Sequence, residues 1–201
     1  MKKFIVSENK YLSRDVKGYY NCDYIGYQKD GNPDFINNLK NMSNKSSELD
    51  LVADFIAVSE KLLKDLKKII DEQNYIGCTI CTVPRSKTES KYHQSQLLFK
   101  KAVASAADNI GCVDGTSAIR RVKDTKTTHN WRLSPNYGDA PYGGITKDTC
   151  AIDEVMIRGK NIILVDDIYC DGVNVVEDCI QALFDFGAEN VILYVIAKTK
   201  G

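Results

Sequence analysis

Hydrophobic and polar residues along this chain form two kinds of pattern, which predict strands and helices in alternation. Three apolar runs have the length of buried strands: Tyr75–Val83, Asn161–Val165 and Val191–Ala197. Three segments place apolar residues at helical spacing: from Ser47 or Asp50 to Ile69, from Lys91 to Ala107, and from about Val173 to Phe186. Strands that alternate with helices indicate a parallel sheet with right-handed crossovers. The predicted fold class is therefore α/β, with a mainly parallel twisted sheet flanked by helices.

The beginning of the chain differs from this pattern because it is polar and rich in tyrosine. Tyr20–Gln28 has the character of a strand, and Phe35–Lys40 that of a short helix. The length of 201 residues fits one domain with a small appendage. We interpret residues 1–45 as a small N-terminal hood and residues 46–201 as the core domain.

The most informative segment runs from Asn161 to Asn174. A predicted strand leads directly into two acids, Asp166 and Asp167, and Gly172 follows just before a helix begins. In open α/β sheets, ligands bind at the carboxyl ends of the strands, and the amino terminus of a helix attracts anions. Carboxylates accept hydrogen bonds from ribose hydroxyls while backbone N–H groups hold a phosphate, so the pattern suits a sugar phosphate. The alternative is a solvated strand end.

This segment resembles the PRPP-binding signature of type I phosphoribosyltransferases. The shared pattern is a hydrophobic strand, two acids, two apolar residues and a small-residue loop around glycine. Tyr169 and the segment 187–191 are most similar to the ComF-like branch of the family. The resemblance covers residues 158–198 well, residues 76–121 loosely and the first 50 residues poorly.

The resemblance implies transfer of the 5-phosphoribosyl group from PRPP to a nitrogenous acceptor, with release of pyrophosphate. It implies that Asp166 and Asp167 are catalytic, accept from the ribose hydroxyls and bind the metal, a Mg²⁺ ion that bridges pyrophosphate oxygens. The residues that it assigns to the 5-phosphate are Cys170, Asp171, Gly172, Val173 and Asn174. The residues that it assigns to pyrophosphate are Arg85, Ser86 and Lys87.

Three residues depart from the family pattern. Family members mostly carry small hydroxyl residues or alanine where this chain has Cys170 and Asp171, and often threonine at the position of Asn174. A carboxylate beside a phosphate repels it unless the carboxylate points away or binds a cation. The Cys170 thiol, at a helix amino terminus, is either a nucleophile or a small residue that fits the loop, and we favour the second.

Basic residues occur at two further places. Arg85 and Lys87 follow the strand 75–83, where a guanidinium fork and a point charge suit pyrophosphate; the alternative is a solvated basic turn. The second group, which ComF-like chains place before a loop that closes over the substrate, consists of Arg120, Arg121 and Lys123. Here that lid would extend from Asp124 to about Gly144 and include His129 and Trp131.

Composition limits the classes of partner. Lysine plus arginine and aspartate plus glutamate both number 27, so no global basic field attracts nucleic acid or an anionic membrane. No apolar run approaches the ~20 residues of a membrane helix, and the opening residues turn polar too soon for a signal peptide. We therefore expect a cytoplasmic protein, and we leave open a homo-oligomer.

Seven cysteines at irregular spacing do not form a disulfide framework. Cys78 and Cys81 have a CxxC spacing, which suits zinc or redox chemistry. They lie in a predicted strand, however, where residues three apart point to opposite faces. The sequence therefore argues against a metal site at these two cysteines.

Two other classes of function remain open. One is a binding module that senses PRPP or a nucleotide without catalysis, or a ComF-like partner in DNA uptake or processing, and Asp171 and Asn174 favour it. The other is a hydrolase on a related α/β sheet, such as a nucleosidase or phosphatase. The acceptor base is not specified by the sequence, because the hood and lid that would select it carry the weakest patterns.

Overall fold

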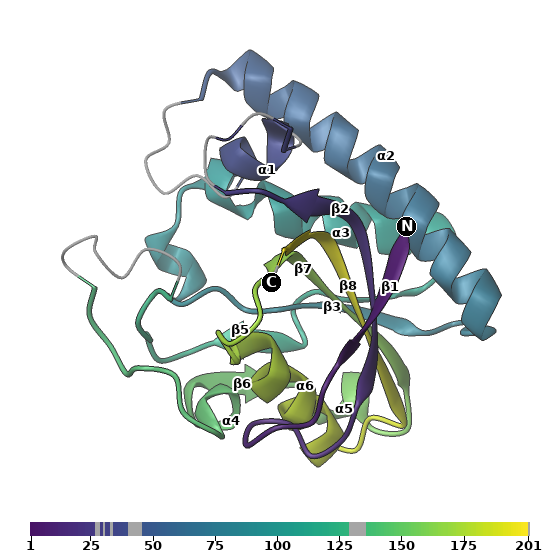
Figure 1. Ribbon diagram of the computed structural model, residues 1–201, viewed down its shortest axis with the longest axis vertical. Coiled ribbons are helices and arrows are strands. Elements are labelled where there is room, and N and C mark those ends of the chain that lie inside the picture. The colour runs from purple at the N-terminus through teal and green to yellow at the C-terminus, as the bar shows by residue number, and fades with distance from the viewer. Residues whose placement is uncertain (27–28, 30, 33, 40–45, 129–135, 201) are drawn as a thin grey trace.

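The computed structural model describes residues 1–26, 29, 31–32, 34–39, 46–128 and 136–200. Among these residues, six strands form one sheet in the order β1-β2-β8-β7-β3-β4, and helices cover both of its faces (Figure 1). The strands of this sheet are β1 (Lys2–Val6), β2 (Val16–Tyr24), β3 (Thr79–Thr82), β4 (Val113–Gly115), β7 (Asn161–Tyr169) and β8 (Asn190–Thr199). A second, antiparallel sheet consists of β5 (Ile119–Arg121) and β6 (Cys150–Ile152).

The helices form two layers (Figure 1). On one face of the sheet lie α1 (Asp34–Leu39), α2 (Glu48–Gln73) and α3 (Leu98–Ile110). On the other lie α4 (Ile145–Thr149), α5 (Glu154–Ile157) and α6 (Val175–Asp185). Two short 3₁₀ turns, Glu89–Lys91 and Gln94–Leu97, connect β3 to α3.

The sheet is mainly parallel. In the described part of the chain, β2, β8, β7, β3 and β4 run in the same direction, and β1 runs antiparallel to β2. The predicted α/β class with a mainly parallel sheet is therefore confirmed. Because parallel strands end on the same side, the carboxyl ends of β3, β7 and β8 share one edge, which we call the carboxyl edge.

The core explains why β7 is almost continuously apolar. Ile163 and Val165 pack into the cluster beneath α2 and α3, whereas Ile162 and Leu164 pack into the cluster beneath α6. A strand that is covered on both faces needs apolar residues at every position, and not at alternate ones. The predicted strand 161–165 has this character, and the structure continues it to Tyr169.

The N-terminal segment contributes directly to the main sheet. β2 pairs with β8 from Gly18 to Tyr24, and the Tyr19 side chain is buried. Residues 2–6 and 16–24 therefore belong to the sheet, whereas the sequence pattern assigns them to a separate hood. The end of that hood, residues 40–45, lies outside the described residues, so the boundary at residue 45 stays a prediction.

Helix α2 begins where the sequence indicates. Ser47 is its N-cap, and the Ser47 hydroxyl accepts a hydrogen bond from the Asp50 N–H at 3.2 Å.

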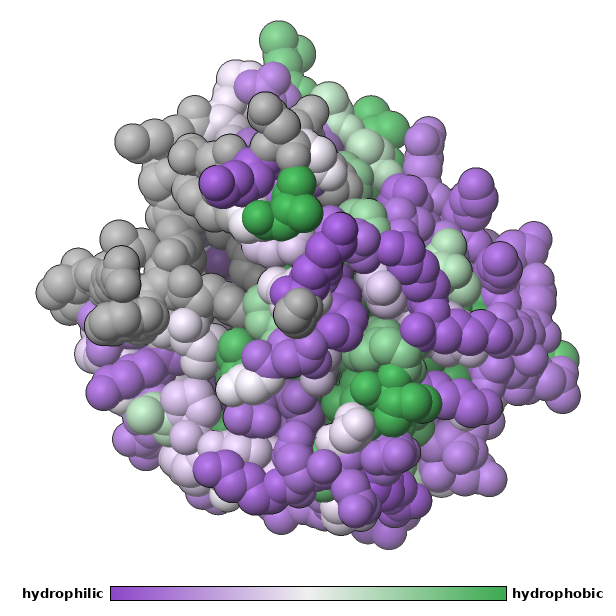
Figure 2. Space-filling model, in the orientation of Figure 1, coloured by the Kyte–Doolittle hydropathy of each residue, from purple (hydrophilic) through white to green (hydrophobic). Residues whose placement is uncertain are grey.

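Figure 2 shows that hydrophilic residues cover most of the visible face, and that the apolar residues near the top of the view lie over α2. No helix in the described part of the chain is long and apolar enough to cross a membrane.

Candidate functional site

The acid pair lies inside a strand, at the carboxyl edge. The last ladder contact between β3 and β7 is the hydrogen bond from the Val83 N–H to the Val165 carbonyl, at 3.0 Å. Strand β7 continues to Tyr169, so Asp166 and Asp167 extend past the end of β3. The sequence predicts a strand that stops before the acids. The pairing of β7 with β8 keeps the backbone extended through them.

Both carboxylates are half-buried and accept hydrogen bonds from the local backbone. The Asp167 N–H donates to Asp166 Oδ1 at 2.8 Å, and the Ile168 N–H donates to Asp167 Oδ1 at 2.7 Å. Asp167 also lines a small cavity with side chains of α1, α3 and β8: Phe35, Ile36, Leu39, Phe99 and Ile196. Since adjacent strand residues project to opposite faces, Asp166 is directed to the other side. A ligand that contacts both carboxylates must therefore lie across the end of β7.

The loop of residues 170–174, which we call the phosphate loop after its predicted role, is a tight turn. Gly172 and Asn174 have positive φ angles of 81° and 62°, and the Asn174 side chain donates to the Gly172 carbonyl at 3.0 Å. Asn174 is the N-cap of α6, but its side chain caps no N–H group of the helix. The first turn of α6 therefore presents backbone donors that suit an anion.

The structure shows where the unusual carboxylate of Asp171 points. It forms an ion pair with Lys198 on β8, with 2.6 Å between the Asp171 oxygen and the Lys198 nitrogen. The Lys198 side chain is only 17% exposed, and its ammonium lies 5.5 Å from the centre of the Tyr169 ring. The pairing offsets the negative charge that Asp171 adds to the phosphate loop.

Two buried acids in the first turn of α6 connect the site to its surroundings. Glu177 accepts a hydrogen bond from the Tyr169 hydroxyl at 2.7 Å, and burial together with this hydrogen bond raises the pKa of Tyr169. Asp178 accepts from the backbone N–H groups of Gly144 and Thr146, at the start of α4. Asp178 therefore caps α4 from a neighbouring helix, a role that sequence analysis missed.

The residues Arg85, Ser86 and Lys87, which form the basic loop with Pro84, follow β3 as predicted. Arg85 donates to the Gln96 carbonyl at 2.7 Å, and its guanidinium lies 4.3 Å from the centre of the Tyr92 ring. Both contacts come from the 3₁₀ region before α3. They hold the guanidinium against the chain in this conformation.

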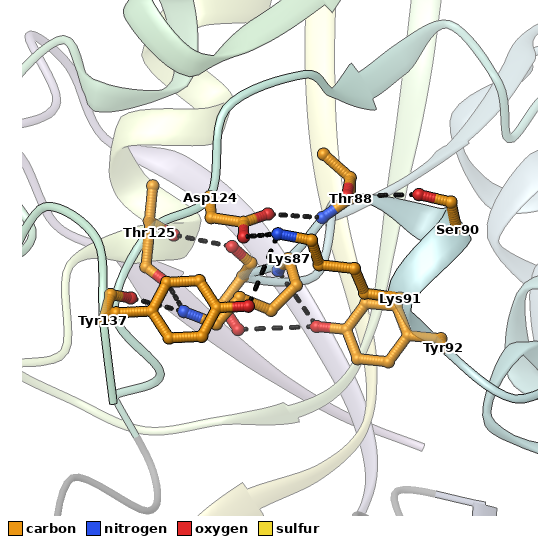
Figure 3. Close-up of polar contacts among 9 residues, drawn as sticks. Lys87, Thr88, Ser90, Lys91, Tyr92, Asp124, Thr125 and Tyr137 are labelled. Atoms are coloured by element: carbon orange, nitrogen blue, oxygen red, sulfur yellow. Dashed lines mark hydrogen bonds and ion pairs between the residues drawn. The ribbon is translucent and has the colours of Figure 1, made fainter. Parts of the chain in front are cut away.

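Lys87 is also engaged within the chain (Figure 3). Its ammonium donates to the carbonyl of Thr125 at 2.6 Å and to the carbonyl of Tyr137, and it lies 3.9 Å from the centre of the Tyr137 ring. Burial lowers the pKa of Lys87. The Thr125 and Tyr137 carbonyls therefore occupy two of the three N–H donors of the Lys87 ammonium.

The beginning of the predicted lid packs against the basic loop. The Thr125 N–H donates to the Ser86 carbonyl at 2.8 Å, and the Ser86 hydroxyl lies 2.9 Å from that of Thr127. Asp124 forms an ion pair with Lys91 and accepts from the Thr88 N–H at 3.0 Å (Figure 3). Burial alone would raise the pKa of Asp124, but these hydrogen bonds lower it. His129 and Trp131 lie outside the described residues.

The three basic residues before the lid have different environments. Arg120 is exposed, and Lys123 forms an exposed ion pair with Asp139. Arg121 is buried, at 6% exposure, and its guanidinium donates to the Arg85 carbonyl at 3.0 Å and to the Thr149 hydroxyl. Arg121 therefore supports the backbone of the basic loop from inside the protein, and it is not on the surface that a lid would present.

Replacing Arg121 with methionine should destabilise the protein. The change leaves the Arg85 carbonyl and the Thr149 hydroxyl without their buried donor, and each such loss costs about 1–3 kcal/mol. We expect the free energy of unfolding, measured by urea denaturation, to fall by about 2–6 kcal/mol. The neighbouring Arg120→Met is the matched control and should change it by less than about 0.5 kcal/mol. Equal effects of the two changes would contradict the supporting role of Arg121.

The two CxxC cysteines point to opposite faces, as the sequence predicts. Cys78 lies in the cluster beneath α2 and α3, and Cys81 lies in the cluster beneath α6. Within the described ranges, no three histidine, cysteine, aspartate or glutamate side chains gather into a metal-binding group. Mg²⁺, in contrast, commonly uses one or two carboxylates together with substrate phosphates. The half-buried carboxylates of Asp166 and Asp167 fit that mode of binding.

The site is therefore assembled from separate parts of the chain. The acids, the phosphate loop, the basic loop and the first residues of the predicted lid all meet at the carboxyl edge. No protein-family model matches this chain, and comparison with curated proteins finds no significant relative.

Proposed function

We propose that the carboxyl edge binds PRPP and transfers its 5-phosphoribosyl group to a nitrogenous acceptor, releasing pyrophosphate. The observation that carries this proposal is the parallel pairing of β3 with β7. This pairing places the basic loop of residues 84–87 next to the acids and the phosphate loop of β7. A molecule with a phosphate at one end and a pyrophosphate at the other can contact both loops at once.

Each part of the site has a role in this proposal. The backbone donors of the phosphate loop and of the first turn of α6 hold the 5-phosphate. Asp166 and Asp167 accept from the ribose hydroxyls. Arg85 and Lys87 bind the pyrophosphate after their side chains exchange intrachain carbonyls for phosphate oxygens. Mg²⁺, when bound through the acids and the phosphates, would neutralise part of the leaving-group charge.

The reaction breaks the bond between ribose C1 and the pyrophosphate oxygen and forms a bond from C1 to the acceptor nitrogen. The ribose carries positive charge in the transition state, so the acids stabilise the ring, while the basic loop stabilises the departing anion. The remaining requirements are alignment of the acceptor and exclusion of water from the reactive cation. The hydrogen bond from Thr125 to Ser86 joins the first residues of the predicted lid to the basic loop, which supports a role for the lid in that exclusion.

A specific observation supports a second candidate, a module that senses PRPP or a nucleotide without turning it over. Lys87 and Arg85 both donate to carbonyls of their own chain. In a sensor, a ligand that replaces those carbonyls would release Thr125 and Tyr137 from Lys87, and Gln96 from Arg85, and so transmit its binding. The same contacts suit an enzyme whose site assembles on binding.

Measurement of pyrophosphate release from PRPP distinguishes the two candidates. We expect the wild-type protein with Mg²⁺ to release pyrophosphate with at least one member of a panel of purines, pyrimidines and simple amines. Lys87→Met should reduce the rate at least ~100-fold, because the leaving group loses a cation in the transition state. Lys160→Met, at the opposite end of β7, is the matched control and should be neutral. PRPP binding without release for any acceptor would favour the sensor. Absence of both binding and release would refute the transferase and a sensor of PRPP.

A further inference from the structure

Two cysteines face each other at the amino ends of β3 and β4, opposite the carboxyl edge. The Sγ atoms of Cys78 and Cys112 are 3.5 Å apart. The two residues directly precede the ladder pair Thr79–Val113, and the Val113 N–H donates to the Cys78 carbonyl at 3.0 Å. Both backbones are therefore fixed by the sheet, and the two thiols are in contact.

This arrangement fits the geometry of a disulfide. Neighbouring strands lie about 4.7–4.9 Å apart, inside the Cα separation of about 4.4–6.8 Å that disulfides require. The sulfur atoms have to move from 3.5 Å to a bond length of about 2.05 Å, which small side-chain rotations provide. All seven cysteines are thiols in this structure. We propose that Cys78 and Cys112 form a reversible dithiol–disulfide site.

The environments of the two thiols suggest an order of reaction with a low-molecular-weight disulfide such as oxidised glutathione. Cys112 is partly exposed, whereas Cys78 is buried. The Cys112 thiolate attacks one sulfur of oxidised glutathione and expels one glutathione thiolate. The Cys78 thiolate then attacks the Cys112 sulfur in the mixed disulfide and expels the second glutathione. Two protein thiols are oxidised, one glutathione disulfide is reduced to two thiols, and the protons of the protein thiols pass to the glutathione thiolates.

The position of the pair predicts what oxidation changes. The bond would close a loop of the chain that contains the basic loop and α3, and cross-linking such a loop stabilises a fold by restricting the unfolded chain. It would form at the amino edge of the sheet, and the proposed ligand site lies at the carboxyl edge. We therefore expect oxidation to raise the Tm by several degrees and reduction to reverse the rise.

The test is peptide mapping without reduction, after equilibration of the wild-type protein with mixtures of reduced and oxidised glutathione. We expect a linked pair of peptides that contain Cys78 and Cys112, which forms in oxidising mixtures and disappears after reduction. Cys112→Ser should abolish the linked pair. Cys22→Ser, which removes a thiol at the edge of the same core cluster, should leave it unchanged.

Two results would overturn the proposal. One is a wild-type protein in which Cys78 and Cys112 stay unlinked in fully oxidising mixtures. The other is a linked pair that involves different cysteines in place of these two. Both are read from the wild-type protein, so the test holds even if Cys112→Ser fails to fold.

Discussion

Replacing both Asp166 and Asp167 with asparagine is expected to weaken PRPP binding severely and to leave the protein folded. Hydrogen bonds that involve a charged group are each worth about 1.5–3 kcal/mol. Loss of the charge at both positions should therefore weaken binding by roughly 10²- to 10⁴-fold. The fold should tolerate the change because both side chains are half-buried, and asparagine keeps an oxygen that accepts from the same backbone N–H groups. Calorimetric titration with PRPP and Mg²⁺ measures the loss.

The control for this variant must carry the same change in net charge. Asp71 on α2 and Asp108 on α3 are both exposed, so Asp71→Asn combined with Asp108→Asn provides it. We expect the control to bind PRPP as the wild type does. If the folded Asp166→Asn, Asp167→Asn variant bound PRPP with wild-type affinity, neither acid would belong to the binding site.

Replacing Lys198 with methionine is expected to cause the second large effect, a loss of phosphate and PRPP affinity. Lys198 is the partner of Asp171, so its removal leaves a carboxylate without its cation beside the phosphate loop. At a separation of ~4–6 Å, repulsion between two unit charges is on the order of 1–4 kcal/mol. The affinity should fall roughly tenfold to several hundredfold, as measured by titration with inorganic phosphate and with PRPP.

A double-mutant cycle separates this electrostatic effect from a loss of packing. Asp171→Thr removes the negative charge and leaves the Lys198 ammonium beside the loop, so it should tighten phosphate binding. Asp171→Thr combined with Lys198→Met should bind more tightly than Lys198→Met alone, because the repelling carboxylate is gone. If the double variant binds no better than Lys198→Met, the ion pair does not control the charge at the loop.

The fold was most predictable where local pattern and tertiary environment agree. Ser47 is followed by apolar residues at helical spacing. In the structure Ser47 caps α2, and these apolar residues form the buried face of the helix. The continuous apolar runs of β7 and β8 also predicted two strands buried on both faces. In the structure both faces of these strands are covered. The placement of the phosphate loop after β7 follows from the same local signals, namely Gly172 and the helix that begins at Val175.

What the sequence did not predict depends on pairing between distant segments. β1 and β2 join the main sheet, although nothing in their polar, tyrosine-rich sequence specifies β8 as a partner. The burial of Arg121 depends on two acceptors, the Arg85 carbonyl and the Thr149 hydroxyl, that are remote in the sequence. The sequence did carry a signal for the Asp171–Lys198 pair. Lys198 directly follows the apolar run 191–197, so it was expected to lie at the carboxyl edge, near the loop that contains Asp171.

The local helix prediction also failed at one place near the site. Residues 91–107 have apolar residues at helical spacing, but α3 begins only at Leu98. The preceding residues form 3₁₀ turns whose Gln96 carbonyl and Tyr92 ring hold Arg85. Contacts with the basic loop replace the first turns of the predicted helix.

Titration of the wild-type protein with PRPP and with the two ends of that molecule tests the central claim most directly. The claim is that the carboxyl edge holds a phosphate at the loop after β7 and a pyrophosphate at the loop after β3. With Mg²⁺ present, ribose 5-phosphate and pyrophosphate should each bind alone, more weakly than PRPP, and each should displace it. Lys198→Met should weaken ribose 5-phosphate more than pyrophosphate, and Lys87→Met should do the reverse. Absence of PRPP binding to the folded wild-type protein would contradict the account.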